Sequence, residues 1–166
     1  MAYGPDPPAD PGDLSADGVI AYYNGTFTYT ADPLDPGLNM PRLWTIGEGA
    51  TVSGPTYASI NTPQDGEDYE LRVDGGRLVL GSGTSWMQSN STGKFKLSVT
   101  NGADAAFAGN LYCVASNEKV LDLAQIDIDV KDGAALSVGR NFTFGRENTK
   151  HAKELRAALS VVGASL

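Results

Sequence analysis

The fold is decided by the stretch Leu71-Arg-Val-Asp-Gly-Gly-Arg-Leu-Val-Leu-Gly81, in which two runs of alternating apolar residues flank a small turn and end in glycine. The same phrase returns at residues 97–109 and 128–139, and a shorter form occupies residues 159–163. Its closing glycines are spaced by 28, 30 and 24 residues. Repeats of roughly 20–50 residues are typical of stacked-repeat proteins, so the phrase predicts an all-β fold, a short β-solenoid.

The apolar residues of each repeat recur at every second position, which places them on one face of a strand. Val73, Val99 and Val130 each come last before a turn, so we expect them to stack in one buried column. The turns consist of Asx-Gly or Gly-Gly pairs, residues that tolerate the left-handed backbone conformation of a tight corner. These predicted corners are residues 74–76, 101–102 and 132–133.

The first seventy residues differ from the repeats. Residues 1–17 are rich in proline and aspartate, a composition that favours an extended arm. A single β domain is expected over residues 18–166, and within it residues 18–70 form an N-terminal β cap. Asn24-Gly25, between two alternating runs, predicts a hairpin in this cap. The repeats then occupy residues 71–145, with projecting loops expected at 84–93 and 115–121.

The last stretch, residues 146–166, is compatible with two structures. Ala152, Leu155, Leu159 and Val162 fall at helical spacing and Gly163 could end a helix, so we expect a short C-terminal helix over about 149–158. The run 159–163 also repeats the strand phrase, which leaves a strand open for the final residues.

Composition excludes several classes of partner. The formal net charge of −8 opposes binding to nucleic acid or to anionic membranes, because both require clustered lysine and arginine. No run approaches the roughly 20 apolar residues of a membrane span, so we expect no membrane insertion. Cys113 is the only cysteine, which excludes a disulfide within the chain and a thiolate metal cluster, and we expect no cofactor.

The repeat resembles a known family in three places, Val73-Asp-Gly-Gly-Arg-Leu-Val-Leu-Gly81, Ala106-Phe-Ala-Gly-Asn-Leu-Tyr112 and Ala135-Leu-Ser-Val-Gly-Arg-Asn-Phe142. These phrases are similar to the autotransporter-associated β-strand repeats of bacterial surface proteins, over roughly the second half of the chain. The resemblance implies a right-handed parallel β-helix, an extracellular or cell-surface location with any export signal removed, and a stalk, adhesin or passenger role. It carries no catalytic residues over to this chain.

Three residues are candidates for ligand binding. Asp127 and Asp129 alternate with apolar positions, so both face outward, where they could hold calcium or sugar acids or simply keep the face soluble. We expect them to bind no metal. Trp86, in the expected loop, could stack on a sugar or pack against its own solenoid wall. His151 is the only histidine, and neither a nucleophile nor an orienting acid is indicated beside it, so we expect no catalysis there.

Three functions remain compatible with these patterns. The first is a non-enzymatic structural module of an extracellular surface protein or appendage, which self-associates head to tail into homo-oligomers or filaments, with the arm of residues 1–17 laid across the next subunit. The second is a carbohydrate-binding or adhesive module, and the third is a polysaccharide-active enzyme, for which the chain is short. The repeats favour the first.

Overall fold

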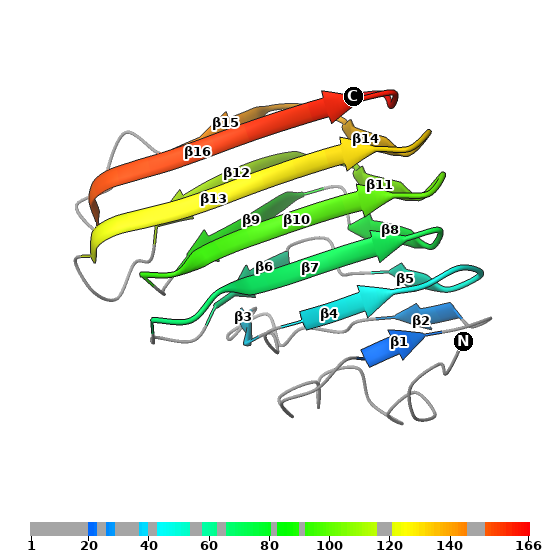
Figure 1. Cartoon of the computed structure of the whole chain (residues 1–166), viewed down its shortest axis with the longest axis horizontal. Helices are drawn as coiled ribbons and strands as arrows, with labels where there is room; N and C mark the ends of the chain where they lie inside the picture. The colour runs from blue at the N-terminus through cyan, green and yellow to red at the C-terminus, as the bar shows by residue number, and fades with distance from the viewer. Residues whose placement is uncertain are drawn as a thin grey trace.

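The computed structural model describes residues 20–22, 26–28, 37–39, 43–53, 58–62, 66–80, 83–89, 92–115, 121–145 and 152–166. This part of the chain is a parallel β-solenoid, stacked from β1 at one end to β16 at the other (Figure 1). The predicted all-β solenoid is confirmed, and the described residues contain no helix. The expected arm at residues 1–17 lies outside them.

Successive strands join three sheets in rotation, and all strand pairs of the described residues are parallel. Sheet A contains β1 (Ile20–Tyr22), β4 (Leu43–Ile46), β7 (Tyr69–Asp74), β10 (Lys94–Thr100), β13 (Leu121–Lys131) and β16 (Ala152–Val162). Sheet B contains β2 (Thr26–Thr28), β5 (Thr51–Ser53), β8 (Arg77–Leu80), β11 (Asp104–Phe107) and β14 (Ala135–Val138). Sheet C contains β3 (Gly37–Asn39), β6 (Ala58–Asn61), β9 (Thr84–Ser89), β12 (Asn110–Ala115) and β15 (Phe142–Phe144).

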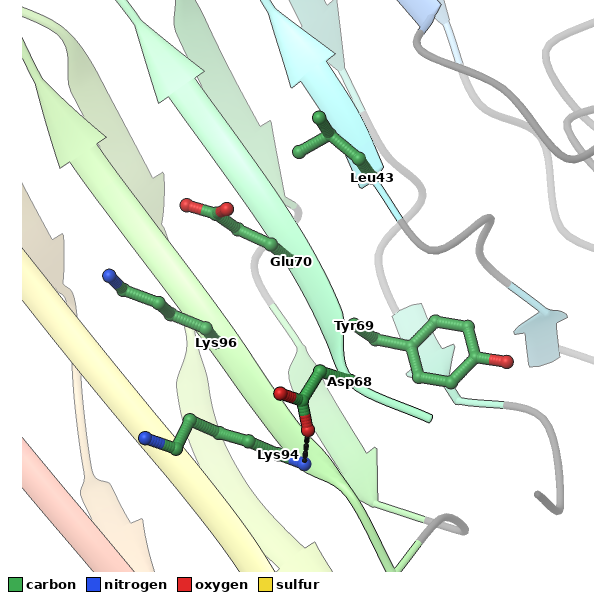
Figure 2. Close-up of a pocket in the computed structure, with 6 residues that line it drawn as sticks. All are labelled: Leu43, Asp68, Tyr69, Glu70, Lys94 and Lys96. Atoms are coloured by element: carbon green, nitrogen blue, oxygen red, sulfur yellow. Dashed lines mark hydrogen bonds between the residues drawn. The ribbon is translucent and has the colours of Figure 1, made fainter. Parts of the chain in front are cut away.

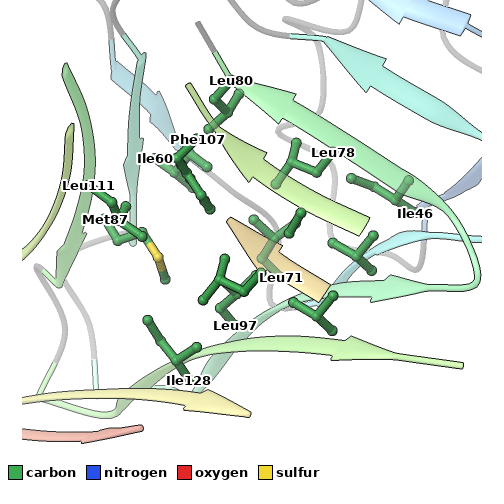
Figure 3. Close-up of a cluster of buried hydrophobic side chains, with 14 of the residues drawn as sticks. Ile46, Ile60, Leu71, Leu78, Leu80, Met87, Leu97, Phe107, Leu111 and Ile128 are labelled. Atoms are coloured by element: carbon green, nitrogen blue, oxygen red, sulfur yellow. The ribbon is translucent and has the colours of Figure 1, made fainter. Parts of the chain in front are cut away.

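The core lies between the three sheets and consists of columns of apolar side chains (Figure 3). Val99 pairs with Val73 on one side and with Val130 on the other, and all three are buried. The predicted valine column is therefore confirmed. It extends to Ile46 on β4 and to Val161 on β16. Stacking like residues at the strand spacing of about 4.8 Å lets each rung bury the apolar face of the next.

The predicted corners adopt the left-handed backbone conformation. Asn101 and Asp132 have φ of 56° and 57°, and the glycine after each is also left-handed. At residue 101 the turn is closed by a hydrogen bond that the Ala103 amide donates to the Thr100 carbonyl over 3.1 Å. Gly49, with φ of 78°, marks a further corner that the repeat did not reveal.

The closing glycine of the repeat has a steric cause at residue 139. Its amide donates to the Phe107 carbonyl over 2.8 Å, which draws two rungs together. A Cβ atom at this position would overlap the backbone carbonyl of Ala108. Only glycine allows this approach.

The expected C-terminal helix is wrong for residues 152–158, which belong to β16. This strand pairs with β13 from Leu121↔Ala152 to Lys131↔Val162, and its corner at Gly163 leads to a bridge between Ser165 and Ala135. Leu155 and Leu159 fit both a helical and an alternating pattern. The unpaired amide and carbonyl groups of β13 decide between them, because a strand satisfies them and a helix does not.

Two further expectations fail, the hairpin around Asn24-Gly25 and the loop that includes residues 84–89. Residues 20–22 and 26–28 do not form a hairpin, because β1 pairs with β4 in sheet A and β2 with β5 in sheet B. The stretch expected as a cap thus supplies strands to the same three sheets as the repeats. Residues 84–89 are strand β9 rather than a loop. In each case a parallel partner one rung away outweighs the local turn signal.

Candidate functional site

The two predicted carboxylates lie on the outer face of sheet A, where each is paired with a lysine of β10. The Nζ atom of Lys94 is 2.9 Å from Oδ2 of Asp127, and that of Lys96 is 2.8 Å from Oδ2 of Asp129. In the sheet register Lys96 lies beside Asp127, so each lysine reaches diagonally to the next carboxylate. The hydrogen bond to Asp127 raises the pKa of Lys94.

Each of the two aspartate carboxylates is therefore balanced by the positive charge of a lysine. Two matched ion pairs across neighbouring strands neutralise a row of carboxylates that would otherwise repel one another. Among the described residues, no group of three or more His, Cys, Asp or Glu side chains lies close enough to hold a metal ion. At these positions the structure shows a cross-strand ladder of ion pairs.

Glu70 on β7 forms a second polar cluster on the same face. Its carboxylate accepts hydrogen bonds from Nη2 of Arg72 over 2.7 Å and from Oγ of Ser98 over 2.6 Å. Burial by itself raises the pKa of Glu70, but the hydrogen bonds from Arg72 and Ser98 outweigh it, so the pKa lies below its ordinary value. The hydrogen bond between Arg72 and Glu70 also raises the pKa of Arg72.

A shallow hollow of about 250 Å³ lies beside these clusters (Figure 2). Its lining is Leu43, Asp68, Tyr69, Glu70, Lys94 and Lys96. Each charged group in it already has a protein partner, including Asp68, which accepts a hydrogen bond from the Lys94 amide over 2.7 Å. A ligand that entered the hollow would have to displace these contacts.

Trp86 lies on the outer face of sheet C, in β9, and not in a projecting loop. Its register partner on β12 is Tyr112, and the two ring centroids are 6.5 Å apart with an angle of 26° between the planes. Both side chains are half-buried. The indole therefore packs along its own solenoid wall and still reaches the surface.

A column of polar side chains runs beside these rings. Nδ2 of Asn110 donates to Oγ1 of Thr84 over 3.2 Å, and Nδ2 of Asn141 donates to Oδ1 of Asn110 over 3.0 Å. The Asn141 backbone amide donates to the same Oδ1 over 3.2 Å. These bonds hold the Asn110 amide in one orientation.

Apolar residues are also exposed near β16. One lies in β15 and the others lie in β16 or follow it: Phe144, Leu159, Val161, Val162 and Leu166. Leu159 and Val161 continue the core columns through Ile128 and Val130, yet are 38% and 39% exposed. We call these five residues the β16 surface.

The sequence indicated Trp86 and both aspartates but missed their partners. Aligning two repeats in the sequence at their corners, Asn101-Gly102 and Asp132-Gly133, would have placed Lys96 beside Asp127, as they lie in the sheet register. Tyr112 and the asparagine column gave no separate signal, because irregular spacing in sheet C hides which residues share a column. His151 lies outside the described residues.

The single thiol is enclosed. Cys113 is buried in the core, and burial raises its pKa to about 12. At neutral pH it is a protonated apolar group without nucleophilic character.

Comparisons with protein-family models, with curated proteins and with solved structures found no match for this chain. Within the described residues, no helix is long and apolar enough to cross a membrane.

Proposed function

We propose that the protein is a non-enzymatic structural module of an extracellular surface protein or appendage, and that copies of the chain associate head to tail. The observation that carries this proposal is the β16 surface, where core columns reach solvent without a further layer. Leu159 and Val161 extend columns whose described side chains from β4 to β13 are at most 2% exposed. Apolar area at the end of such a stack is stabilised when another rung covers it.

The edge of β16 supports the same proposal. In the described part of the chain β16 pairs with β13 alone, and β1 at the other end pairs with β4 alone. An edge strand presents amide and carbonyl groups to any strand that can pair with it. A second copy that placed its first rung against β16 would continue sheet A in the parallel sense. Such a contact is heterologous, so it forms filaments unless its rotation closes a ring.

The non-enzymatic role has two supports. Each charged side chain of sheet A that lines the hollow is bound to another side chain of the same sheet face, and the only cysteine is a buried thiol of high pKa. The surface location draws on the resemblance to autotransporter-associated repeats, whose members include stalks and passenger domains. A right-handed winding and an arm at residues 1–17 that lies across the next subunit belong to the same proposal.

Association is tested by placing a charge on the β16 surface. Leu159→Lys should abolish the concentration-dependent rise in mass seen by light scattering, because a lysine would be buried at the contact. Ser160→Lys, on the opposite face of the same strand, is the matched control and should leave assembly intact. Deletion of residues 1–17 tests the arm separately. A parent chain that stays monomeric at high concentration would refute the association.

Location needs its own measurement. Antibodies raised against the chain should label intact cells of the source organism, and protease added outside should remove the label. Label that appears only after the cells are permeabilised would contradict an extracellular role.

A further inference from the structure

We propose that the outer face of sheet C binds a neutral glycan through Trp86 and Tyr112. The site consists of this aromatic pair and the polar column beside it, formed by Thr84, Asn110 and Asn141. It is independent of the β16 surface, because it lies on the side of the solenoid.

The rings offer a platform that the fold itself holds in place. Trp86 and Tyr112 project from paired positions of two parallel strands, so the backbone register fixes their separation. The ring centroids are 6.5 Å apart, farther than in two rings stacked directly face to face, so each ring covers only part of the other. The faces of aromatic rings are electron-rich and attract the polarised C–H groups of a sugar ring. The other tryptophan, Trp44, is 2% exposed and cannot take this role.

The polar column supplies hydrogen-bonding groups in fixed positions. The Asn110 amide is anchored by Thr84 and by Asn141, so its direction is set before a ligand arrives. Among the described residues, the bond to Thr84 uses one N–H of Asn110 Nδ2, so the second N–H can donate to a ligand. No bond within the same residues occupies Oδ1 of Asn141, so this oxygen can accept from a ligand. Apolar surface beside a few oriented polar groups is the usual composition of a small-molecule site. A donor and an acceptor next to aromatic rings match sugar hydroxyl groups.

Charge decides which glycan this surface takes. The five residues of the site include no aspartate, glutamate, lysine, arginine or histidine. Lys94 and Lys96 on sheet A are already paired with carboxylates, and the chain has a net charge of −8. An acidic polysaccharide would therefore be repelled, whereas a neutral one would not.

The test is a calorimetric titration of the full chain with soluble neutral hexasaccharides of glucose, mannose, galactose and N-acetylglucosamine, and with oligogalacturonate as the acidic probe. We expect at least one neutral hexasaccharide to bind in the millimolar range or better, and oligogalacturonate not to bind. Trp86→Ala and Tyr112→Ala should each weaken the neutral interaction about tenfold. Tyr112→Phe, which keeps the ring, should retain it.

The matched control is Thr45→Ala, an outward position of sheet A, which should leave glycan affinity unchanged. Circular dichroism of each variant establishes that it is folded before titration. If Trp86→Ala or Tyr112→Ala unfolds, the proposal is tested with Tyr112→Phe and Asn141→Ala instead. Loss of Asn141 should also weaken binding. No neutral binding, preferred binding of oligogalacturonate, or equal affinity in parent and Trp86→Ala would overturn the proposal. Trp86→Ala should leave association unchanged, which light scattering measures. A failure of the glycan proposal can therefore be told apart from a failure of the association proposal.

Discussion

Truncating the valine column to alanine, one rung at a time, tests the solenoid register most directly. Val73 and Val99 are fully buried, Val130 is 1% exposed and Val161 is 39% exposed. All four occupy one column, so the same chemical change is made at four depths of the stack. The free energy of unfolding should fall steeply at the first three positions and little at the fourth.

The magnitudes follow from burial. Removing two buried methyl groups costs about 1.6 kcal/mol of transfer free energy at about 0.8 kcal/mol each, and the remaining cavity raises this to about 2–3 kcal/mol. At Val161 a large part of the side chain is already in water and no closed cavity forms, so the cost should be about 1 kcal/mol or less. For a chain of this size, these values correspond to losses in Tm of roughly 5–10 °C and 2–4 °C.

The assay is urea unfolding followed by far-ultraviolet circular dichroism, at a protein concentration where the parent is monomeric. Monomeric conditions matter because association would cover Val161 and raise the cost of its truncation. A cost at Val161 equal to that at Val99 under these conditions would refute the exposed position of β16. A cost below about 1 kcal/mol at Val73, Val99 or Val130 would refute the shared buried column.

The other predictions concern single groups. Val130→Asp should lower the free energy of unfolding by several kcal/mol, because it buries an unpaired charge, and a Tm near that of the parent would contradict the core placement. Glu70 has a pKa below its ordinary value, so its contribution to stability is present above about pH 4.5 and is lost as the pH falls through the folded-state pKa; Glu70→Gln should flatten the acid limb of a Tm against pH curve, and an unchanged limb would exclude the contact with Arg72 as its source. Cys113 should resist iodoacetamide at pH 8 until urea unfolds the chain, because burial raises its pKa to about 12, and rapid labelling of the folded protein would contradict this. Ser85 Oγ is buried without a hydrogen-bond partner in the described structure, so Ser85→Ala should leave Tm unchanged or raise it, as chemical denaturation can measure.

Local chemistry was enough to predict the repeating unit. Alternation with a period of two assigns Val73, Val99 and Val130 to one face whatever their partners are. Asn101-Gly102 and Asp132-Gly133 form corners because the left-handed conformation is least costly for glycine and asparagine or aspartate. Both properties belong to a few consecutive residues, so the sequence alone determined these strands, these corners and the solenoid class.

Only the tertiary structure decided what lies beside each strand. Residues 152–162 carry a pattern that suits a helix or a strand, and the open edge of β13 selects the strand. The corners align Lys96 with Asp127 in the sequence, but only the assembled face shows that the Lys96 side chain reaches diagonally to Asp129. The pairing of Trp86 with Tyr112 depends on the register between rungs of sheet C, which the irregular lengths of the connections conceal in the sequence. Register is set by the fit of whole rungs, so the outer faces, and the candidate sites on them, appear only when the stack is assembled.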